Sequence, residues 1–204
     1  MVETTREPLR GYLAVKRPLD LIVTVLFAPV WLSVMALVAL VVMIDVGRPV
    51  LFVQPRVGRL GDPFNLYKFR TMKHTSARSK PAFASQDAAR ISRTGAILRK
   101  YRLDELPQLF NVLKGDMSII GPRPEQVGFA KTFSETIDRY DERHHVLPGI
   151  TGLAQVNSGY ADDVDSTKRK LKYDLEYVRH VSPWLDLKIA IRTIGTILVG
   201  FCAK

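Results

Sequence analysis

The longest hydrophobic stretch in the chain runs from Leu21 to Ile44 and contains no charged residue. As a straight helix these ~24 residues would extend about 36 Å, enough to cross a hydrocarbon core about 30 Å thick. Pro29 interrupts the stretch, and a proline there deletes one helical hydrogen bond and bends the helix. A signal peptide is a poor explanation, because the stretch is too long and lacks a small-residue cleavage site. The pattern predicts a membrane helix broken at Pro29.

Basic residues flank this hydrophobic stretch on both sides. Lys16 and Arg17 precede it, and Arg48, Arg56 and Arg59 follow it. A spanning helix would place one of these groups outside, against the preference of basic residues for the cytoplasmic side. A bent helix that enters and leaves the same leaflet keeps both groups at cytoplasmic headgroups. A re-entrant helix and an ordinary kinked transmembrane helix are both compatible with the sequence.

The pattern beyond Asp45 is that of a soluble domain built from short elements. Alternation predicts strands at 50–54 and 64–70, with turns at Gly58, Gly61 and Asp62-Pro63 between them. Helical spacing predicts helices at 95–100, 106–113, 129–146, 167–180 and 183–199, with a weaker one near 86–91 in the polar loop 73–94. The glycine-rich segment 147–157 is expected to be a loop that leads into a short strand.

These elements indicate an α+β fold that is mostly helical. We expect a basic N-terminal segment with the membrane helix at 1–47 and a small catalytic domain at 48–204. Ser182-Pro183 opens the last helix as an N-cap and first-turn proline. Trp184 at its start and few charges fit an amphipathic helix lying at the membrane interface, and a buried core helix fits equally well. Asp186 on so apolar a helix needs a partner, for which we expect an arginine.

The charge balance points to a negatively charged partner. Thirty lysines and arginines face twenty aspartates and glutamates, which gives a net charge of +10. Such an excess suits nucleic acid, anionic lipid or a phosphorylated substrate. The hydrophobic stretch and the lack of an aromatic and basic binding face disfavour nucleic acid. The single cysteine, Cys202, excludes an internal disulfide and a cysteine-built zinc site.

Two adjacent carboxylates, Asp104 and Glu105, lie where a helix is expected to begin. Pro107 is tolerated only in a first helical turn, and Gly115 ends the apolar spacing. The simplest interpretation makes Asp104 an N-cap and Glu105 a first-turn acid. The free N–H groups of a helix start also attract phosphate, so the pair is equally a candidate for phosphate chemistry.

Basic residues that suit a diphosphate surround this pair in the sequence. Lys68 and Arg70 lie on one side of a predicted strand, where they either face solvent or line an anion site. Arg99 and Arg102 come just before the pair, and Arg123 stands between two prolines that restrict its backbone. The glycines of 147–157 permit close approach of a ligand, or simply tight turns. The chain has no P-loop, since no Gly-Lys-Ser/Thr follows them.

Five motifs in order along the chain resemble a monotopic phosphoglycosyl transferase of the bacterial sugar transferase family. They are Tyr67–Met72, Leu103–Leu109, Gly115–Ser118, Gly121–Pro124 and Pro148–Asn157. The resemblance implies transfer of a sugar 1-phosphate from a UDP-sugar to polyprenyl phosphate, commonly undecaprenyl phosphate, with release of UMP. It implies Mg²⁺, the cytoplasmic face of the bacterial inner membrane, and the start of lipid-linked glycan synthesis. A homodimer is compatible with it.

The resemblance also assigns roles to residues. Asp104 matches the aspartate that forms a covalent phosphosugar intermediate, and Glu105 the neighbour associated with metal and proton handling. Lys68, Arg123 and Asp186 match the family's active-site lysine, PRP arginine and C-terminal aspartate.

The chain departs from the family pattern in two places. Ala28-Pro29 replaces the Ser-Pro pair at which the family's re-entrant helix is broken, so the serine hydroxyl is absent. Ser158-Gly159-Tyr160 replaces the Gly-Arg of some small members, which leaves the donor sugar open. A catalytically silent scaffold that binds polyprenyl phosphate is the alternative function.

Overall fold

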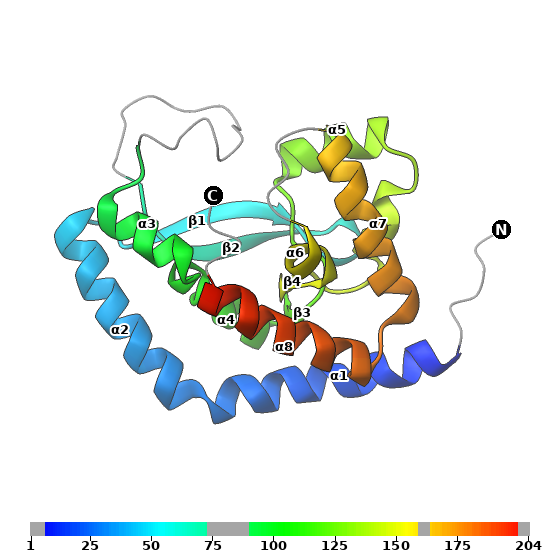
Figure 1. The fold of residues 1–204 in the computed structure, drawn as a ribbon, viewed down its shortest axis with the longest axis horizontal. Coiled ribbons are helices and arrows are strands. Elements are labelled where there is room, and N and C mark those ends of the chain that lie inside the picture. Colours follow the sequence, from blue (N-terminus) through cyan, green and yellow to red (C-terminus); the bar gives the residue numbers. More distant parts are fainter. Residues whose placement is uncertain (1–6, 73–89, 159–163, 200–204) are drawn as a thin grey trace.

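A computed structural model describes residues 7–72, 90–158 and 164–199. It is mostly helical with two small two-stranded sheets, which confirms the coarse fold class (Figure 1). In order, the elements are α1 (Glu7–Leu26), α2 (Ala28–Asp45), β1 (Leu51–Val57), η1 (Arg59–Gly61), β2 (Pro63–Phe69), α3 (Arg93–Lys100), η3 (Leu103–Glu105), α4 (Gln108–Lys114), β3 (Ser118–Ile120), α5 (Val127–Thr136), η4 (Tyr140–His145), β4 (Gly149–Thr151), α6 (Leu153–Asn157), α7 (Val164–His180) and α8 (Pro183–Val199).

The hydrophobic stretch forms two helices that meet at an angle. Helix α1 ends at Leu26, Phe27 separates the two, and Pro29 lies in the first turn of α2, as the sequence predicts. Figure 1 shows α1 along the lower edge and α2 turning away from it. We call this break the elbow. Among the described residues, α2 alone is long and apolar enough to cross a membrane, a test that many soluble core helices also pass.

The hairpin β1–β2 is antiparallel and pairs Leu51 with Phe69 through to Val57 with Pro63. Both predicted strands are therefore confirmed, and the first extends further than expected. Its connection is a 3-10 turn in which Leu60 and Gly61 both have positive φ. Asn111 of α4 joins the hairpin edge: its side-chain oxygen accepts from Tyr67 N at 3.1 Å and its nitrogen donates to Asn65 O at 2.7 Å. These bonds hold the middle of α4 beside β2.

The parallel pair β3–β4 brings two glycine-containing turns into backbone contact. A Cβ on Gly121 would lie 2.4 Å from Leu147 O, and one on Gly152 would lie 2.1 Å from Gly121 O. Only hydrogen fits at such distances, so the glycines permit the two segments to pack against each other. The sequence suggested ligand approach or tight turns for the glycines of 147–157, and the structure shows a different reason for Gly152: close packing against the backbone of Gly121.

The hydrophobic core is divided among several small clusters rather than one large one. The cluster below α7 and α8 includes Ile120, Leu153, Tyr177 and Ile189, and Ile189 is fully buried. The opposite face of α8 exposes apolar side chains: Trp184, Leu187, Ile191 and Ile194. Helix α8 thus has one buried face, as expected of a core helix, and one apolar exposed face; its position at a membrane interface stays a prediction. Its N-cap is confirmed, because Leu185 N donates to Ser182 Oγ at 3.3 Å.

Two predictions about secondary structure need correction. The single helix expected at 129–146 is wrong: α5 ends at Thr136, and Arg139 in the left-handed region separates it from η4. Burial of Tyr140 and Arg143 against α7 favours the second segment. The segment 147–157 contains a short strand, β4, but the residues after it, 153–157, form the helix α6. The helix suggested near 86–91 falls mostly outside the described residues, as does Cys202. The domain boundary at 47 stays a prediction.

Candidate active site

The carboxylate pair lies in a 3-10 turn ahead of α4, not in the first turn of the helix itself. Arg102 has φ 54° and ψ 23°, a left-handed conformation that reverses the chain after α3 and starts this turn. Asp104 and Glu105 are buried, at 8% and 5% exposure. The N-cap interpretation of Asp104 is wrong, because Pro107 occupies the N-cap position of α4 and no side chain caps it. The stop at Gly115, with φ 100°, is confirmed.

Glu105 is surrounded by cations. Its carboxylate accepts from Lys68 Nζ at 2.9 Å and from Arg123 Nη2 at 2.5 Å, and Arg102 Nη1 lies 3.6 Å away. Burial alone would raise the pKa of Glu105, but Arg123 and Lys68 outweigh it and hold that pKa well below its usual range. Burial lowers the pKa of Lys68, against the attraction of Glu105. Glu105 is therefore an ionised anchor for the cations and a poor proton acceptor.

Asp104 differs from its neighbour because no side chain of the described residues bonds its carboxylate. Burial, and then repulsion from Glu105, raise its pKa to about 6, against the attraction of Lys68, Arg99 and Arg123. The group is thus mostly ionised at neutral pH, weakly solvated and unpaired. Those are the properties of a carboxylate that can act as a nucleophile.

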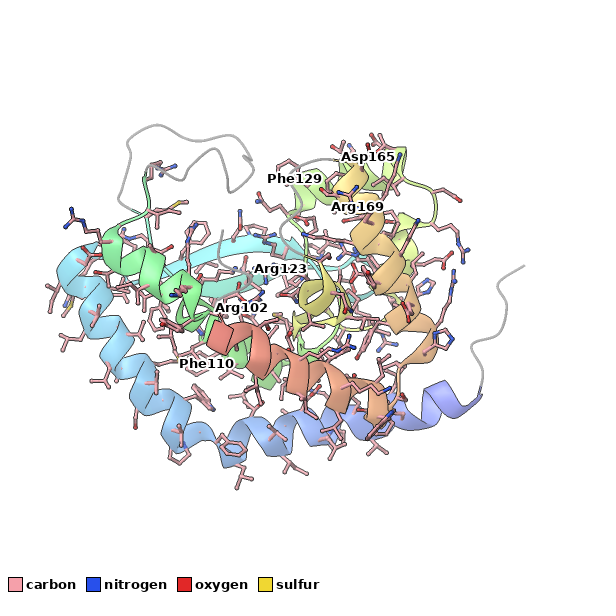
Figure 2. The ribbon with its side chains drawn as sticks, in the orientation of Figure 1. Arg102, Phe110, Arg123, Phe129, Asp165 and Arg169 are labelled. Carbon is pink, nitrogen blue, oxygen red and sulfur yellow. The ribbon has the colours of Figure 1, made fainter. Side chains whose placement is uncertain are left out.

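Gln155 contacts the arginines of the site, although the sequence did not single it out. Its Oε1 accepts from Arg102 Nη1 and from Arg123 Nη1, each at 2.9 Å. Figure 2 shows Arg102 and Arg123 near each other at the centre of the molecule, beside α6. The amide thereby orients both guanidinium groups toward the carboxylate pair. The signal available was the motif Pro148–Asn157, whose glycines pack α6 against the turn that carries Arg123.

Arg143 hydrogen-bonds the backbone of Arg123, a contact that the sequence did not predict. Its guanidinium donates to Arg123 O at 2.9 Å and to Asp174 Oδ2 at 2.7 Å, and it is buried. The spacing of residues in η4 and α7 does not predict the contact between Arg143 and Asp174. It holds the backbone of the Pro-Arg-Pro turn in place.

Arg99 and Arg70, both predicted to bind phosphate, lie in different places. Arg99 donates from Nε to Thr71 Oγ1 at 2.9 Å and is close enough to lower the pKa of Asp104, so it belongs to the site. Arg70 instead donates to Val46 O at 3.0 Å, just after the end of α2. A cation there stabilises the C-terminal carbonyls of a helix. None of the contacts found for Arg70 is with the carboxylate pair.

Asp186 is likewise not brought together with the other site residues. It accepts from Lys16 Nζ at 2.5 Å, from Tyr12 OH at 2.7 Å and from Tyr177 OH at 2.9 Å. The expected arginine partner is wrong: a lysine and two tyrosines satisfy it. We call Tyr12, Lys16, Tyr177 and Asp186 the anchor network, since it joins α1 to α7 and α8. Substrate binding by Asp186 stays an untested prediction.

Of the two carboxylates in the pair, one is available to bind a metal ion. The described residues contain no group of three or more His, Cys, Asp or Glu side chains suited to a metal. Glu105 has both oxygens engaged by Lys68 and Arg123, whereas Asp104 has its carboxylate available. Mg²⁺ in phosphate sites commonly uses one or two carboxylates together with substrate oxygens and water. Asp104 fits such a role with a bound diphosphate.

The charges of the site favour a dianion. Lys68, Arg99, Arg102 and Arg123 face two carboxylates, which leaves a surplus of about two positive charges when all are ionised. A diphosphate diester carries about two negative charges, and planar guanidinium groups bind its oxygens in pairs. The site therefore combines an available carboxylate with a cationic surface whose charge suits a diphosphate.

The chain is similar in sequence to known proteins. The family described as bacterial sugar transferase matches residues 11–200. A UDP-N-acetylgalactosamine-undecaprenyl-phosphate N-acetylgalactosaminephosphotransferase of Aeromonas hydrophila is 45% identical over 193 residues, which are 95% of this chain and 46% of that protein. A UDP-glucose:undecaprenyl-phosphate glucose-1-phosphate transferase of Escherichia coli K12 is 39% identical over 88% of this chain and 39% of its own length.

A shorter relative from Bacillus subtilis is covered more fully. It is named as a putative undecaprenyl-phosphate N-acetylgalactosaminyl 1-phosphate transferase and is 38% identical over 85% of this chain and 86% of its own length. The chain thus spans less than half of the two relatives above and most of this one. The names of these relatives mention different sugars.

Proposed function

The chain belongs to the bacterial sugar transferase family, and from that premise we propose that it transfers a sugar 1-phosphate from a UDP-sugar to undecaprenyl phosphate and releases UMP. The observation that carries the proposal is the contrast within the carboxylate pair. Glu105 is neutralised by Lys68 and Arg123, while Asp104 beside it is buried, unpaired and mostly ionised at neutral pH. The two neighbouring carboxylates are therefore suited to different roles.

In the first step, an oxygen of Asp104 attacks the phosphorus that bears the sugar. A new O–P bond forms, and the bond from that phosphorus to the bridging oxygen breaks, so that UMP leaves with the electron pair. Lys68, Arg102 and Arg123 neutralise the diphosphate that the anionic nucleophile must approach. Arg99 lies on the Asp104 side of the site, where it helps to keep the nucleophile ionised.

In the second step, a phosphate oxygen of undecaprenyl phosphate attacks the same phosphorus. The bond to Asp104 breaks, the carboxylate is restored, and the product is undecaprenyl diphosphate sugar. Two displacements let a water-soluble donor and a membrane-bound acceptor use one site in turn. Bound Mg²⁺, held by Asp104 and the donor's phosphates, would supply charge neutralisation and orientation. Glu105 positions the cations throughout.

We place the enzyme at the cytoplasmic leaflet of the inner membrane, with the elbow as a re-entrant helix. The outer side of the elbow is apolar: Val25, Leu26 and Phe27 are exposed at 61%, 70% and 56%. The exposed apolar face of α8 is a further surface for lipid. This placement brings the acceptor's phosphate to headgroup depth near the site. Initiation of a lipid-linked glycan follows from such a product, and a homodimer stays a prediction.

The test is UMP release in the absence of acceptor, with Mg²⁺ and a panel of UDP-sugars. A burst equal to the enzyme concentration is expected with one donor, together with a protein mass increased by the phosphosugar. Asp104→Asn should abolish both, and Asp165→Asn should change neither, because that side chain is 80% exposed on α7. A full burst from Asp104→Asn would refute the covalent role of Asp104. Folded protein that binds polyprenyl phosphate and turns over no donor would support the scaffold instead.

A further inference from the structure

The elbow leaves backbone carbonyls without their usual helical donors. Pro29 has no N–H for the carbonyl of Val25. Phe27 N donates to Val23 O at 3.2 Å. Val30 N donates to Phe27 O at 3.1 Å and not to Leu26 O four residues earlier, and Trp31 N makes its ordinary helical bond to Phe27 O at 3.1 Å. Within the described residues, the carbonyls of 24–26 therefore receive no backbone donor across the break. In an apolar surrounding, each unpaired carbonyl costs several kcal/mol.

The side chain of Trp31 supplies one missing donor. Its indole Nε1 donates to Thr24 O at 2.8 Å, which joins the two helices across the break. Thr24 and Trp31 are buried, at 2% and 7% exposure, so this bond lies on the inner side of the elbow. The neighbouring hydroxyls do not take its place, because Thr24 Oγ1 donates to Asp20 O and Ser33 Oγ donates to Pro29 O. Ala28 has no hydroxyl to offer.

Trp31 also connects the elbow to the catalytic part of the chain. Its ring meets Phe110 of α4 edge to face, with centroids 5.3 Å apart and planes at 85°. Figure 2 shows Phe110 on the side of α4 that faces the elbow. At the other end of α4, Arg17 of α1 donates to Val112 O at 2.6 Å. Both arms of the elbow therefore hold the helix that directly follows the carboxylate pair.

We propose that Trp31 is a positioning residue that fixes the bend of the elbow through its indole hydrogen bond to Thr24 O. In a continuous helix the carbonyls of Thr24 and Leu26 would regain backbone donors, so the bent form needs a donor of its own. The indole provides it where a helical serine is absent. The inference rests on the re-entry proposed above. Without this bond, part of the population straightens, crosses the membrane and carries the N-terminus to the other side.

The first experiment measures which side of the membrane the N-terminus occupies. In full-length chain with Cys202→Ser and Thr5→Cys, an impermeant maleimide is added outside intact spheroplasts. Trp31→Phe keeps an aromatic ring against Phe110 and removes the donor. It should raise the labelled fraction about five- to tenfold, the effect of losing one hydrogen bond. Trp184→Phe, whose ring is 64% exposed on α8, should leave labelling unchanged.

A rescue variant separates the hydrogen bond from ring packing. In Trp31→Phe with Ala28→Ser, the new hydroxyl can donate to Thr24 O four residues earlier, as Thr24 and Ser33 already do to their own fourth predecessors. Labelling should return to the level of the unaltered chain. Failure of this rescue would assign the effect to packing and overturn the proposal.

A spectroscopic measurement tests the bond directly. The chain has two tryptophans, so a ¹H–¹⁵N spectrum in detergent micelles contains two indole signals, assigned with Trp184→Phe. The Trp31 signal should exchange with deuterium at least tenfold more slowly than that of Trp184. Equal exchange rates, or equal labelling of Trp31→Phe and the unaltered chain, would overturn the role of Trp31. Strong labelling of the unaltered chain would refute re-entry itself, and none of these readouts depends on transferase activity.

Discussion

The anchor network offers a decisive test of what Asp186 does. Its carboxylate is buried together with Lys16, and their side chains are 9% and 10% exposed. Removing one partner of a buried ion pair leaves the other charge unpaired, which costs about 3–5 kcal/mol. Tyr12 and Tyr177 bond different oxygens of Asp186, so in Asp186→Asn the one amide oxygen can still accept from one of them, and Asp20 lies 3.9 Å from Lys16. We therefore expect the lower end, about 3 kcal/mol.

The measurement is the thermal unfolding midpoint in detergent, combined with initial rates. For a chain of this size, about 3 kcal/mol corresponds to a fall of roughly 6–12 °C. Lys16→Met should produce a similar fall, and the double variant should be less destabilised than the sum of the two, because the loss of the Lys16–Asp186 pair is then counted only once. The control Asp165→Asn should unfold at the temperature of the unaltered chain, since its side chain is 80% exposed.

The kinetic result distinguishes the anchor from a substrate ligand. If Asp186 only joins α8 to α1, the fraction that remains folded should keep its KM for donor and acceptor. An unchanged midpoint with KM raised for either substrate in Asp186→Asn, and no such effect in Lys16→Met, would refute this reasoning. It would instead support the substrate-binding role implied by family resemblance.

Three further predictions concern the carboxylate pair, its arginines and the glycine contact. Protonation of Asp104 removes the nucleophile, and its pKa is raised to about 6. The rate of the acceptor-free burst should therefore fall about tenfold per pH unit below that value, and higher Mg²⁺ should move this fall to lower pH because a cation favours the ionised carboxylate. A burst rate that stays constant down to about pH 5 would contradict this prediction. Omitting the acceptor matters, because its own phosphate titrates near pH 6. Gln155→Glu should raise KM for the donor about tenfold with little change in kcat, because a carboxylate at this position would compete with phosphate for Arg102 and Arg123. An unchanged KM would exclude a role of Gln155 in orienting these two arginines. Gly121→Ala should lower the thermal unfolding midpoint by several degrees, because the added methyl group meets backbone atoms. Gly195 of α8 is the control: a Cβ there meets nothing within 4 Å, so Gly195→Ala should leave the midpoint unchanged or raise it. Equal midpoints for the two variants would contradict the packing argument.

The break in the membrane segment and the importance of the carboxylate pair could be predicted from sequence. Both depend on local chemistry: Pro29 lacks an N–H wherever the chain places it, and Gly115 ends a helix because it adopts positive φ. The strands around the 58–62 turn and the cap at Ser182 were predictable for the same reason. Recognition of several motifs in order then indicated the family, although no single motif did so.

The division of labour among the charged residues was decided only by the tertiary structure. Arg70 and Arg123 were both candidates for phosphate binding from the sequence, yet one donates to the backbone just after α2 and the other pairs with Glu105. Gln155, Arg143 and Trp31 owe their roles to partners 7 to 53 residues away, as in the bonds to Thr24 and Arg102. Local patterns determine helices, turns and caps because these form within a few residues. Which charge meets which depends on packing between distant segments, and no local pattern encodes that.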